Sequence, residues 1–305
     1  MPCDGAMKSV RAKRRFQSLL PAAGLIAVLL LSVFAGSAIG SRAHKSNARV
    51  ANSVLLAQQT FRLTQPDQKQ RFTVGCPGRT TPLGGGMTSS PAPTSGGEGV
   101  YPHSYERLGV QHGWHVTAVL FDPDRRSTQA RDVTLQVACG PRLGHVTPPH
   151  TTRYVKPGQT RSAVAVCPGH RRLFAGGFQR TDFVSSGGNY VLESRAISAR
   201  AWRVTAHAFG GFGGQVTAIA YCTRSKRPLL IPVEATMNLG PGVGTATTPS
   251  CPAGTRLTAG GFSTNGSTSV FFTNGMINGS GTWSASGYNW GSGGSLTAYG
   301  YCLNA

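Results

Sequence analysis

Acidic residues are scarce in this chain. Its 305 residues include ten Asp and Glu against thirty Lys and Arg, which gives a formal net charge of +20. A glycosidase needs two carboxylates placed across the bond that it cleaves, yet the stretch from Pro228 to Ala305 has one, Glu234. No Gly-x-Ser-x-Gly motif offers a serine nucleophile instead. These absences predict a protein that is not an enzyme.

Charged residues of both signs together amount to only 13% of the chain, whereas glycine accounts for 41 residues. So much glycine disfavours helices, and 39% hydrophobic residues disfavour disorder. The glycines lack the period of collagen and cluster between alternating apolar and polar runs, a pattern typical of short strands joined by turns. The composition therefore predicts an all-β protein.

A cysteine-framed unit occurs three times. Its landmarks are an opening Cys-Pro, a Gly-Gly pair that starts nine residues later, a Trp, and a closing strand that ends in Cys. The opening cysteines lie 91 and 84 residues apart, so each unit has about 80 to 90 residues. The three sets of landmarks are Cys76, Gly85, Trp114 and Cys139; Cys167, Gly176, Trp202 and Cys222; and Cys251, Gly260, Trp283 and Cys302. We divide the chain accordingly into repeat 1 (54–139), repeat 2 (140–222) and repeat 3 (223–305).

Six of the seven cysteines belong to the repeats, and the seventh, Cys3, precedes them. Zinc sites need closely spaced pairs such as Cys-x-x-Cys, which the chain lacks. Six cysteines allow 15 connectivities, and only pairing within each repeat keeps the repeats equivalent. The predicted disulfides are Cys76–Cys139, Cys167–Cys222 and Cys251–Cys302. Each should join the first and last strands of one sheet, and disulfides indicate an oxidising compartment.

The N-terminal segment indicates export. Residues 19–38 are almost wholly apolar and follow a basic stretch. Residues 1–40 therefore hold either a signal peptide or an uncleaved membrane anchor, since about 20 apolar residues can cross a bilayer. The basic flank stays in the cytoplasm in both cases. With residues 41–53 as a polar tether, the repeats are expected outside the cell, either secreted or anchored.

The strand pattern of the repeats allows two architectures. Three antiparallel repeats can surround a pseudo-threefold axis as a β-prism, or they can form three small β-sandwiches in a row. From each closing Cys to the next opening Cys there are 28 and 29 mostly strand-like residues, so little free linker remains. This favours the β-prism. The Gly-Gly pair lies in a strand with no helix after it, which indicates a bulge or a close backbone contact rather than a phosphate loop.

The Cys-Pro opening, the glycine followed by an apolar residue, and the closing Cys strand resemble the repeat of vitelline membrane outer layer protein I. The resemblance covers all three repeats through a few residues in each. It implies a three-sheet β-prism. The acidic-Asp-Thr-Ala signature associated with that family is absent, so the resemblance implies no catalytic role.

Two histidines flank the Trp of repeat 1. His112 and His115 are an odd number of residues apart, so in a strand their side chains point to opposite faces. This spacing predicts structural or exposed roles and no zinc site.

Repeat 2 is strongly basic. From Gly140 to Arg227 there are 13 Lys and Arg and two acids. Such a concentration of charge favours polyanions such as wall polymers or acidic glycans, and it also suits a role in solubility alone. The candidate polyanion-binding residues flank the Gly-Gly strand or surround the Trp: Arg171, Arg172, Arg180, Arg195, Arg200 and Arg203.

Repeat 3 is neutral and sets aromatic residues among Asn, Ser, Thr and Gly. Aromatic rings beside amides and hydroxyls suit stacking on sugars. Trp283 belongs to the repeat pattern and is expected in the core. Tyr288 and Trp290 have no counterpart in the other repeats and are therefore better candidates for a site, unless they fill a gap at the end of the stack. The candidate glycan-binding residues are Tyr288, Trp290, Asn289 and Asn274.

We thus expect an exported, non-catalytic binding protein that recognises a glycan or an anionic envelope polymer. No cofactor, no metal and no specific nucleic-acid recognition are expected. The alternative is a structural ectodomain, anchored in the membrane, with no specific small ligand.

Overall fold

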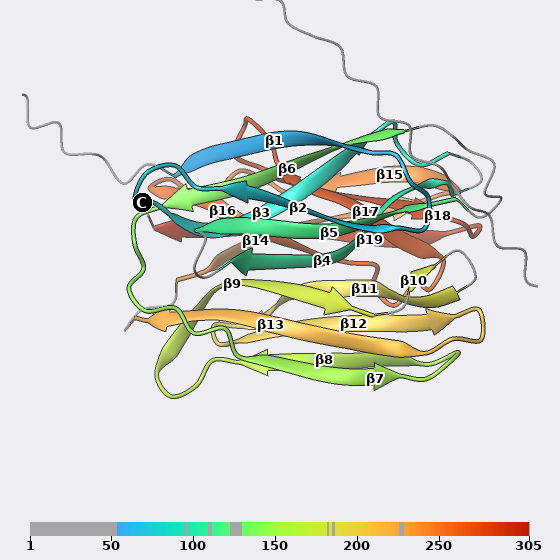
Figure 1. Ribbon diagram of the computed structural model, residues 1–305. Coiled ribbons are helices and arrows are strands. Elements are labelled where there is room, and N and C mark those ends of the chain that lie inside the picture. Colours follow the sequence, from blue (N-terminus) through green and yellow to red (C-terminus); the bar gives the residue numbers. More distant parts are fainter. Residues whose placement is uncertain are drawn as a thin grey trace, which may run out of the picture. The chain divides into compact units, whose positions relative to one another are not determined.

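The computed structural model describes residues 54–94, 97–108, 112–122, 130–181, 183–184, 187–225 and 229–304. The predicted targeting segment (1–40) and tether (41–53) lie outside these residues. The described residues form 19 strands in three antiparallel sheets and no helix (Figure 1). The all-β prediction is confirmed.

Each sheet has six strands in a continuous hydrogen-bonded path. Sheet A runs through β1 (Leu55–Leu63), β6 (Arg131–Gly140), β3 (Thr81–Ser90), β17 (Val270–Ile277), β18 (Trp283–Asn289) and β15 (Gly242–Thr247). Sheet B runs through β2 (Lys69–Gly75), β5 (Gly113–Phe121), β4 (Gly99–Leu108), β9 (Arg171–Arg180), β13 (Gly214–Arg224) and β7 (His150–Val155). Sheet C runs through β14 (Ile231–Leu239), β19 (Gly294–Asn304), β16 (Thr255–Ser263), β11 (Gly187–Ser198), β12 (Ala201–Phe209) and β8 (Thr160–Val166), and short β10 (Phe183–Val184) pairs with β11.

No sheet belongs to a single repeat. In repeat 1, β1, β3 and β6 lie in sheet A, whereas β2, β4 and β5 lie in sheet B. Repeats 2 and 3 are divided in the same way, so every sheet joins half of one repeat to half of another. The joining pairs are β4 with β9, β11 with β16, and β17 with β3. The last pair closes repeat 3 onto repeat 1, which a row of separate sandwiches would not do. The repeats therefore form a ring with pseudo-threefold symmetry.

The three disulfides have the predicted pairing, Cys76–Cys139, Cys167–Cys222 and Cys251–Cys302. Their position differs from the expectation that each closes one sheet. Each opening Cys follows an edge strand (β2, β8 or β15), and each closing Cys lies in a strand of a different sheet (β6, β13 or β19). Each bridge therefore ties together the two sheets that share its repeat.

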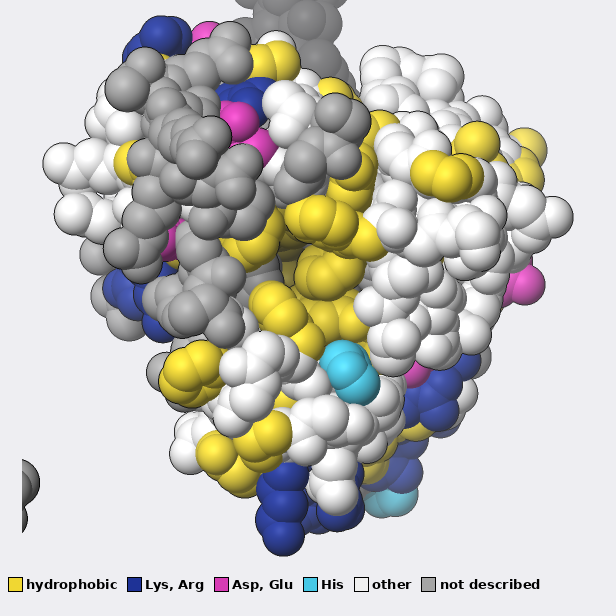
Figure 2. Space-filling view, turned by 90° about the vertical axis from the view of Figure 1, so that its right-hand side faces the viewer, with side chains coloured by type: hydrophobic (Ala, Val, Ile, Leu, Met, Phe, Trp, Pro, Cys, Tyr) yellow, Lys and Arg dark blue, Asp and Glu magenta, His cyan; other side chains and the backbone are white. Residues whose placement is uncertain are grey.

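The strands give the three-sheet body two distinct ends. One, which we call the cystine end, carries the three disulfides. At the other, the aromatic end, β4, β11 and β17 begin and bring together Tyr101, Tyr190 and Phe271. Figure 2 views the aromatic end and shows hydrophobic side chains gathered in a hollow at its centre.

The Gly-Gly pairs make room for two different neighbours, which confirms the predicted close contact. A Cβ on the first glycine would lie 2.5 Å from Trp114 at Gly85 and 1.9 Å from Trp202 at Gly176. A Cβ on the second would meet backbone of an adjacent repeat, as at Gly177 of repeat 2, where it would lie 2.1 Å from the carbonyl oxygen of Tyr105 in repeat 1. The first glycine therefore receives the Trp of its own repeat, and the second lets two repeats join.

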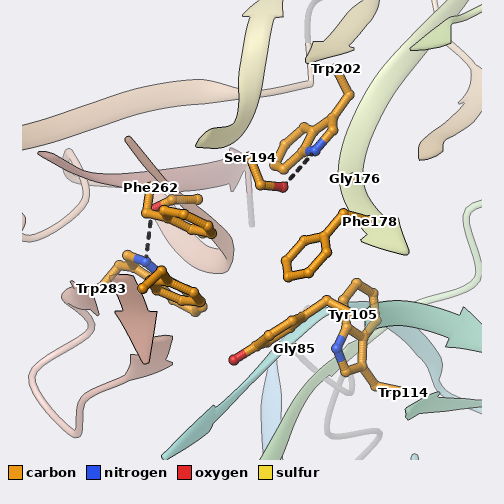
Figure 3. A pocket seen from close by; sticks show the side chains of 13 residues that line it. Gly85, Tyr105, Trp114, Gly176, Phe178, Ser194, Trp202, Phe262 and Trp283 are labelled. Atoms are coloured by element: carbon orange, nitrogen blue, oxygen red, sulfur yellow. Dashed lines mark hydrogen bonds between the residues drawn. The ribbon is translucent and has the colours of Figure 1, made fainter. Parts of the chain in front are cut away.

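Bulky side chains fill the space between the three motif tryptophans. Figure 3 shows the rings of Tyr105, Phe178 and Phe262 gathered there. All three tryptophans are buried, including Trp283 as predicted. The cavity that remains is about 20 Å³, roughly the room of one water molecule. This region is hydrophobic core and not a ligand pocket.

At each junction between repeats, a buried side-chain oxygen of one repeat accepts a hydrogen bond from a backbone N–H of another. The hydroxyl oxygen of Tyr221 accepts a hydrogen bond from the Arg107 backbone N–H at 2.7 Å, and that of Tyr301 accepts one from the Ala196 N–H at 2.7 Å. Ala138 takes the corresponding place in repeat 1. There the Gln136 side chain accepts from the Ile277 N–H at 3.0 Å instead.

Candidate functional site

Three of the six predicted polyanion-binding arginines serve the fold. Arg180 is buried and donates to the carbonyl oxygens of Pro102 and Asn189. Burial lowers its pKa to about 9, so it stays charged at neutral pH. Arg195 and Arg203 both donate to the Glu193 carboxylate. These three guanidinium groups are already engaged within the protein, so the predicted six-residue set does not form one binding surface.

Glu193 is the centre of a polar cluster on the outer face of sheet C. Burial raises its pKa, but hydrogen bonds from Arg203, Thr205 and Arg195 outweigh burial and hold the pKa below its ordinary value. The guanidinium of Arg195 also lies 5.2 Å from the centre of the Tyr299 ring. One carboxylate is thus shared by two guanidinium groups.

The other three arginines lie at the cystine end. The Arg171 guanidinium donates to the His145 carbonyl oxygen at 3.2 Å, and that of Arg200 donates to the Cys167 carbonyl oxygen at 2.7 Å. Arg172 is half-buried at the start of β9.

Arg171 also borders two adjoining hollows that it shares with Arg224. We call these the cystine-end groove. It is lined by Leu143, Gly144, His145, Pro168, Gly169, His170, Arg171, Thr223, Arg224 and Ser225.

Arg171 occupies a position that has a different residue in the other repeats. The turn after each opening Cys-Pro is closed by a backbone hydrogen bond to the proline carbonyl, donated by Thr80, Arg171 or Thr255. The two threonines also bond that carbonyl with their hydroxyls. Repeat 2 therefore has a cation, Arg171, where the other repeats have a turn-stabilising threonine. The same arginine lines the cystine-end groove.

The predicted glycan-binding residues are not placed together on the surface. Asn289 is 1% exposed, and its amide donates to the carbonyl oxygens of Leu239 and Gly240. Asn274 is buried and accepts hydrogen bonds from the backbone and hydroxyl of Ser89. Tyr288 is buried as well. The prediction that these three face a ligand is corrected, because their side chains belong to the fold.

Trp290 is the exception, with 46% of its surface exposed at the aromatic end. Its ring lies edge-on to those of Tyr288 and Phe271, with centroids 5.3 and 6.1 Å away. The expectation that it lacks counterparts is wrong. It follows the motif Trp by seven residues, as Phe121 and Phe209 do in the other repeats.

A polar groove that the sequence did not predict crosses the outer face of sheet B. We call it the sheet B groove. It is lined by Lys69, Arg71, His103, Ser104, Glu106, Thr117, Gln179, Arg180, Thr181, Gln215 and Thr217. The lining residues come from repeats 1 and 2, which meet in this sheet.

Glu106 has a fixed position in the sheet B groove. Its Oε1 lies 3.0 Å from His115 Nε2, and its Oε2 accepts a hydrogen bond from the Gln179 amide. Burial raises the Glu106 pKa, but the interactions with His115 and Gln179 outweigh burial, and the pKa lies below its ordinary value. His115 is buried and His112 is exposed, in keeping with the roles predicted for them.

His103 is buried in the same groove, and its Nε2 has no hydrogen-bond partner among the described residues. Burial and the nearby positive charges of Arg180 and Lys69 lower its pKa to about 2. The imidazole is therefore neutral at physiological pH, and its Nε2 is enclosed as well as unpartnered.

Neither a metal cluster nor a membrane-spanning helix occurs in the part of the chain that the structure describes. The molecule is a disulfide-closed, all-β protein of three repeats, and three disulfides fit an exported protein. No family model matches its sequence, and no curated protein is significantly similar to it.

Proposed function

We propose that this chain is an exported, non-catalytic protein that binds an anionic polymer outside the cell through the cystine-end groove of repeat 2. The observation that carries the proposal is the composition of the groove lining. Arg171, Arg224, His145 and His170 lie there, and no Asp or Glu is among the described lining residues. A polymer with closely spaced negative charges would displace its counterions on binding such a surface.

The distribution of the remaining charge supports this choice of site. Glu193 is the only described acid of repeat 2 and is held by Arg195 and Arg203. Beyond this cluster the repeat carries further described cations. Those that are exposed include Arg142, Arg153, Lys156 and Arg161, and Arg224 follows just beyond the closing Cys.

The test is the salt dependence of binding to heparin, used as a model polyanion. We expect affinity to fall steeply between about 50 and 200 mM salt, with a log–log slope set by the number of cations engaged. Arg224→Ala should reduce that slope by about one. Arg256→Ala, which removes an exposed arginine at the cystine end of repeat 3, serves as the matched control and should leave it unchanged. Retention that does not depend on salt would contradict the proposal.

A second candidate function is glycan binding at the aromatic end. Trp290 supports it, because its exposed indole lies edge-on to the rings of Phe271 and Tyr288. Figure 2 shows a hollow among hydrophobic side chains at this end of the body. An array of neutral glycans tests this function. We expect a binder whose affinity falls in Trp290→Ala and is retained in Trp290→Phe, which restores the residue type of the other repeats. An array without any binder would exclude it.

A further inference from the structure

The outer faces of the three sheets carry matching rows of hydroxyl groups near their edges. Each of the six edge strands has one residue, at an equivalent position, that lies directly opposite a residue of the neighbouring strand. In five of these six cross-strand pairs both residues carry a hydroxyl, and a hydrogen bond of 2.7 or 2.8 Å joins the two hydroxyls. These pairs are Thr60–Thr134, Thr152–Thr217, Ser162–Thr205, Thr236–Thr297 and Thr245–Ser286.

The sixth pair breaks this pattern. In sheet B the edge strand β2 places Arg71, and not a hydroxyl residue, opposite Thr117. The equivalent positions hold Ser162 in sheet C and Thr245 in sheet A, each paired with a hydroxyl. Arg71 is exposed and lines the sheet B groove. The groove therefore lies where the shared row is interrupted by a cation.

A second departure from the threefold pattern lies in the same groove. Strands β4, β11 and β17 each have a bulge at an equivalent residue, which is His103, Leu192 or Thr273. Leu192 is buried among apolar side chains, and the Thr273 hydroxyl donates to the Ser286 carbonyl oxygen at 3.2 Å. His103 lines the sheet B groove, and its enclosed Nε2 has no partner among the described residues. Bulges often re-aim a side chain at a site, and a buried polar atom without a partner needs an explanation.

We propose that the sheet B groove binds an acidic sugar, a ring that carries both a carboxylate and hydroxyl groups, with Arg71 bonding the carboxylate and the His103 imidazole bonding a hydroxyl. The guanidinium fork matches a carboxylate in geometry and charge. The neutral imidazole can bond a hydroxyl without taking up a proton.

The floor of the groove has the chemistry that the rest of such a ligand needs. The register brings Thr117, Ser104, Gln179 and Thr217 into one row across four neighbouring strands. Neighbouring strands lie about 4.8 Å apart, so this row offers polar groups at intervals that can follow the hydroxyls of a saccharide. Glu106 is held beside the row by His115 and Gln179, and its carboxylate can accept from a further hydroxyl.

The equivalent region of sheet C explains why one sheet alone has such a site. Glu193 replaces Ser104 there, and it is bonded to Arg195, Arg203 and Thr205. The polar groups of sheet C therefore bond one another, whereas sheet B leaves an exposed arginine and an unpartnered imidazole among the residues that line a groove.

Titration calorimetry with the exported protein tests the proposal. The probes are trisaccharides of glucuronate and of galacturonate, each compared with its neutral glucose or galactose counterpart. We expect a uronate probe to bind saturably and its neutral counterpart to bind about tenfold more weakly or worse, because a charge-assisted pair is lost. Arg71→Ser installs the residue of the equivalent position in sheet C, and it should weaken uronate binding to the same extent.

Two further variants complete the design. His103→Leu installs the residue of the equivalent bulge in β11, and it should lower affinity for the uronate while the near-ultraviolet circular dichroism shows an intact core. Arg161→Ala removes an exposed arginine from edge strand β8 of sheet C and should leave binding unchanged. Absence of saturable binding by both uronate probes, or equal affinity in the wild type and Arg71→Ser, would overturn the proposal.

The proposal does not depend on the cystine-end groove. Loss of heparin binding in Arg224→Ala together with unchanged uronate binding would separate the two sites. Nuclear magnetic resonance shifts induced by the uronate at Arg224 and His170, and not at Arg71 and His103, would place the sugar in the cystine-end groove and overturn the proposal.

Discussion

The two ends of the three-sheet body are closed by different chemistry. At the cystine end, three covalent bridges tie the sheets together across 63, 55 and 51 residues of chain. At the aromatic end the described residues contain no bridge, and stacked rings such as Tyr190 and Phe271, with centroids 4.2 Å apart, hold the sheets instead. Where disulfides join the sheets, the neighbouring loops can carry charged residues such as Arg171 and Arg224. Where packing joins them, an exposed ring such as Trp290 contacts the rings of Phe271 and Tyr288.

Removal of one bridge is the strongest test of this contrast. Cys167→Ala with Cys222→Ala frees a loop of 55 residues and should lower the free energy of unfolding by about 4 kcal/mol. Urea unfolding measures the change. Cys3→Ala, which leaves all three bridges in place, should have no effect. A loss below about 1 kcal/mol would mean that packing alone closes the cystine end.

Truncation of the central ring tests the aromatic end. Phe271→Ala removes contacts with Tyr190, Tyr101 and Phe209 and should lower the free energy of unfolding by about 3 kcal/mol. Phe212→Ala, at a largely exposed ring, should change it little. Thermal unfolding of both variants gives the comparison, and equal stability of the two would show that the aromatic end does not rely on packing.

The junctions between repeats lie between the two ends. Tyr301→Phe removes the acceptor of the Ala196 N–H and should cost about 2 kcal/mol, because a buried donor is left without a partner. Tyr154→Phe, at an exposed tyrosine, is the control. Hydrogen exchange should report faster exchange at Ala196 in Tyr301→Phe, and unchanged protection there would contradict the assignment.

Acid should weaken the region nearer the aromatic end, where His103 lies two residues from Tyr101. Its folded-state pKa of about 2 is far below the unfolded value of 6.5. Below pH 6.5 the unfolded chain takes up a proton that the folded protein does not, so stability falls as the pH falls, by about 1.4 kcal/mol per pH unit. The unfolding free energy of His103→Leu should decline less than that of the wild type between about pH 6.5 and pH 5. Parallel curves would contradict a neutral buried His103.

The repeat pattern predicted those features that each copy must have. The disulfide pairing, the buried Trp283 and the close contact at the Gly-Gly pairs follow from landmarks that recur at equal spacing. The division of each repeat between two sheets could not be predicted in this way, because alternation shows which face of a strand is buried and not which strand lies beside it.

The candidate sites were predicted less well, for reasons that particular residues show. In the sequence Arg180 is indistinguishable from a surface arginine. Its burial is explained by the backbone carbonyl groups that accept its hydrogen bonds in the fold. The pairing of Glu193 with Arg195 had a signal, since residues two apart in a strand share a face. The sequence also held a signal that Trp290 belongs to the repeat pattern, because it follows Trp283 by seven residues, as Phe121 and Phe209 follow the other motif tryptophans. Nothing in the sequence marks His103 as the residue of a bulge.

The closure of the ring has a consequence for how the protein is made. β3 of repeat 1 pairs with β6 of its own repeat but gains its second neighbour only when β17 of repeat 3 has been synthesised, and 185 residues separate the two partners Ser89 and Asn274. Until then a nascent chain presents an open sheet edge, which is a template for pairing with other chains. The same closure means that a circularly permuted chain, opened between repeats 1 and 2 instead, should reach the same native topology.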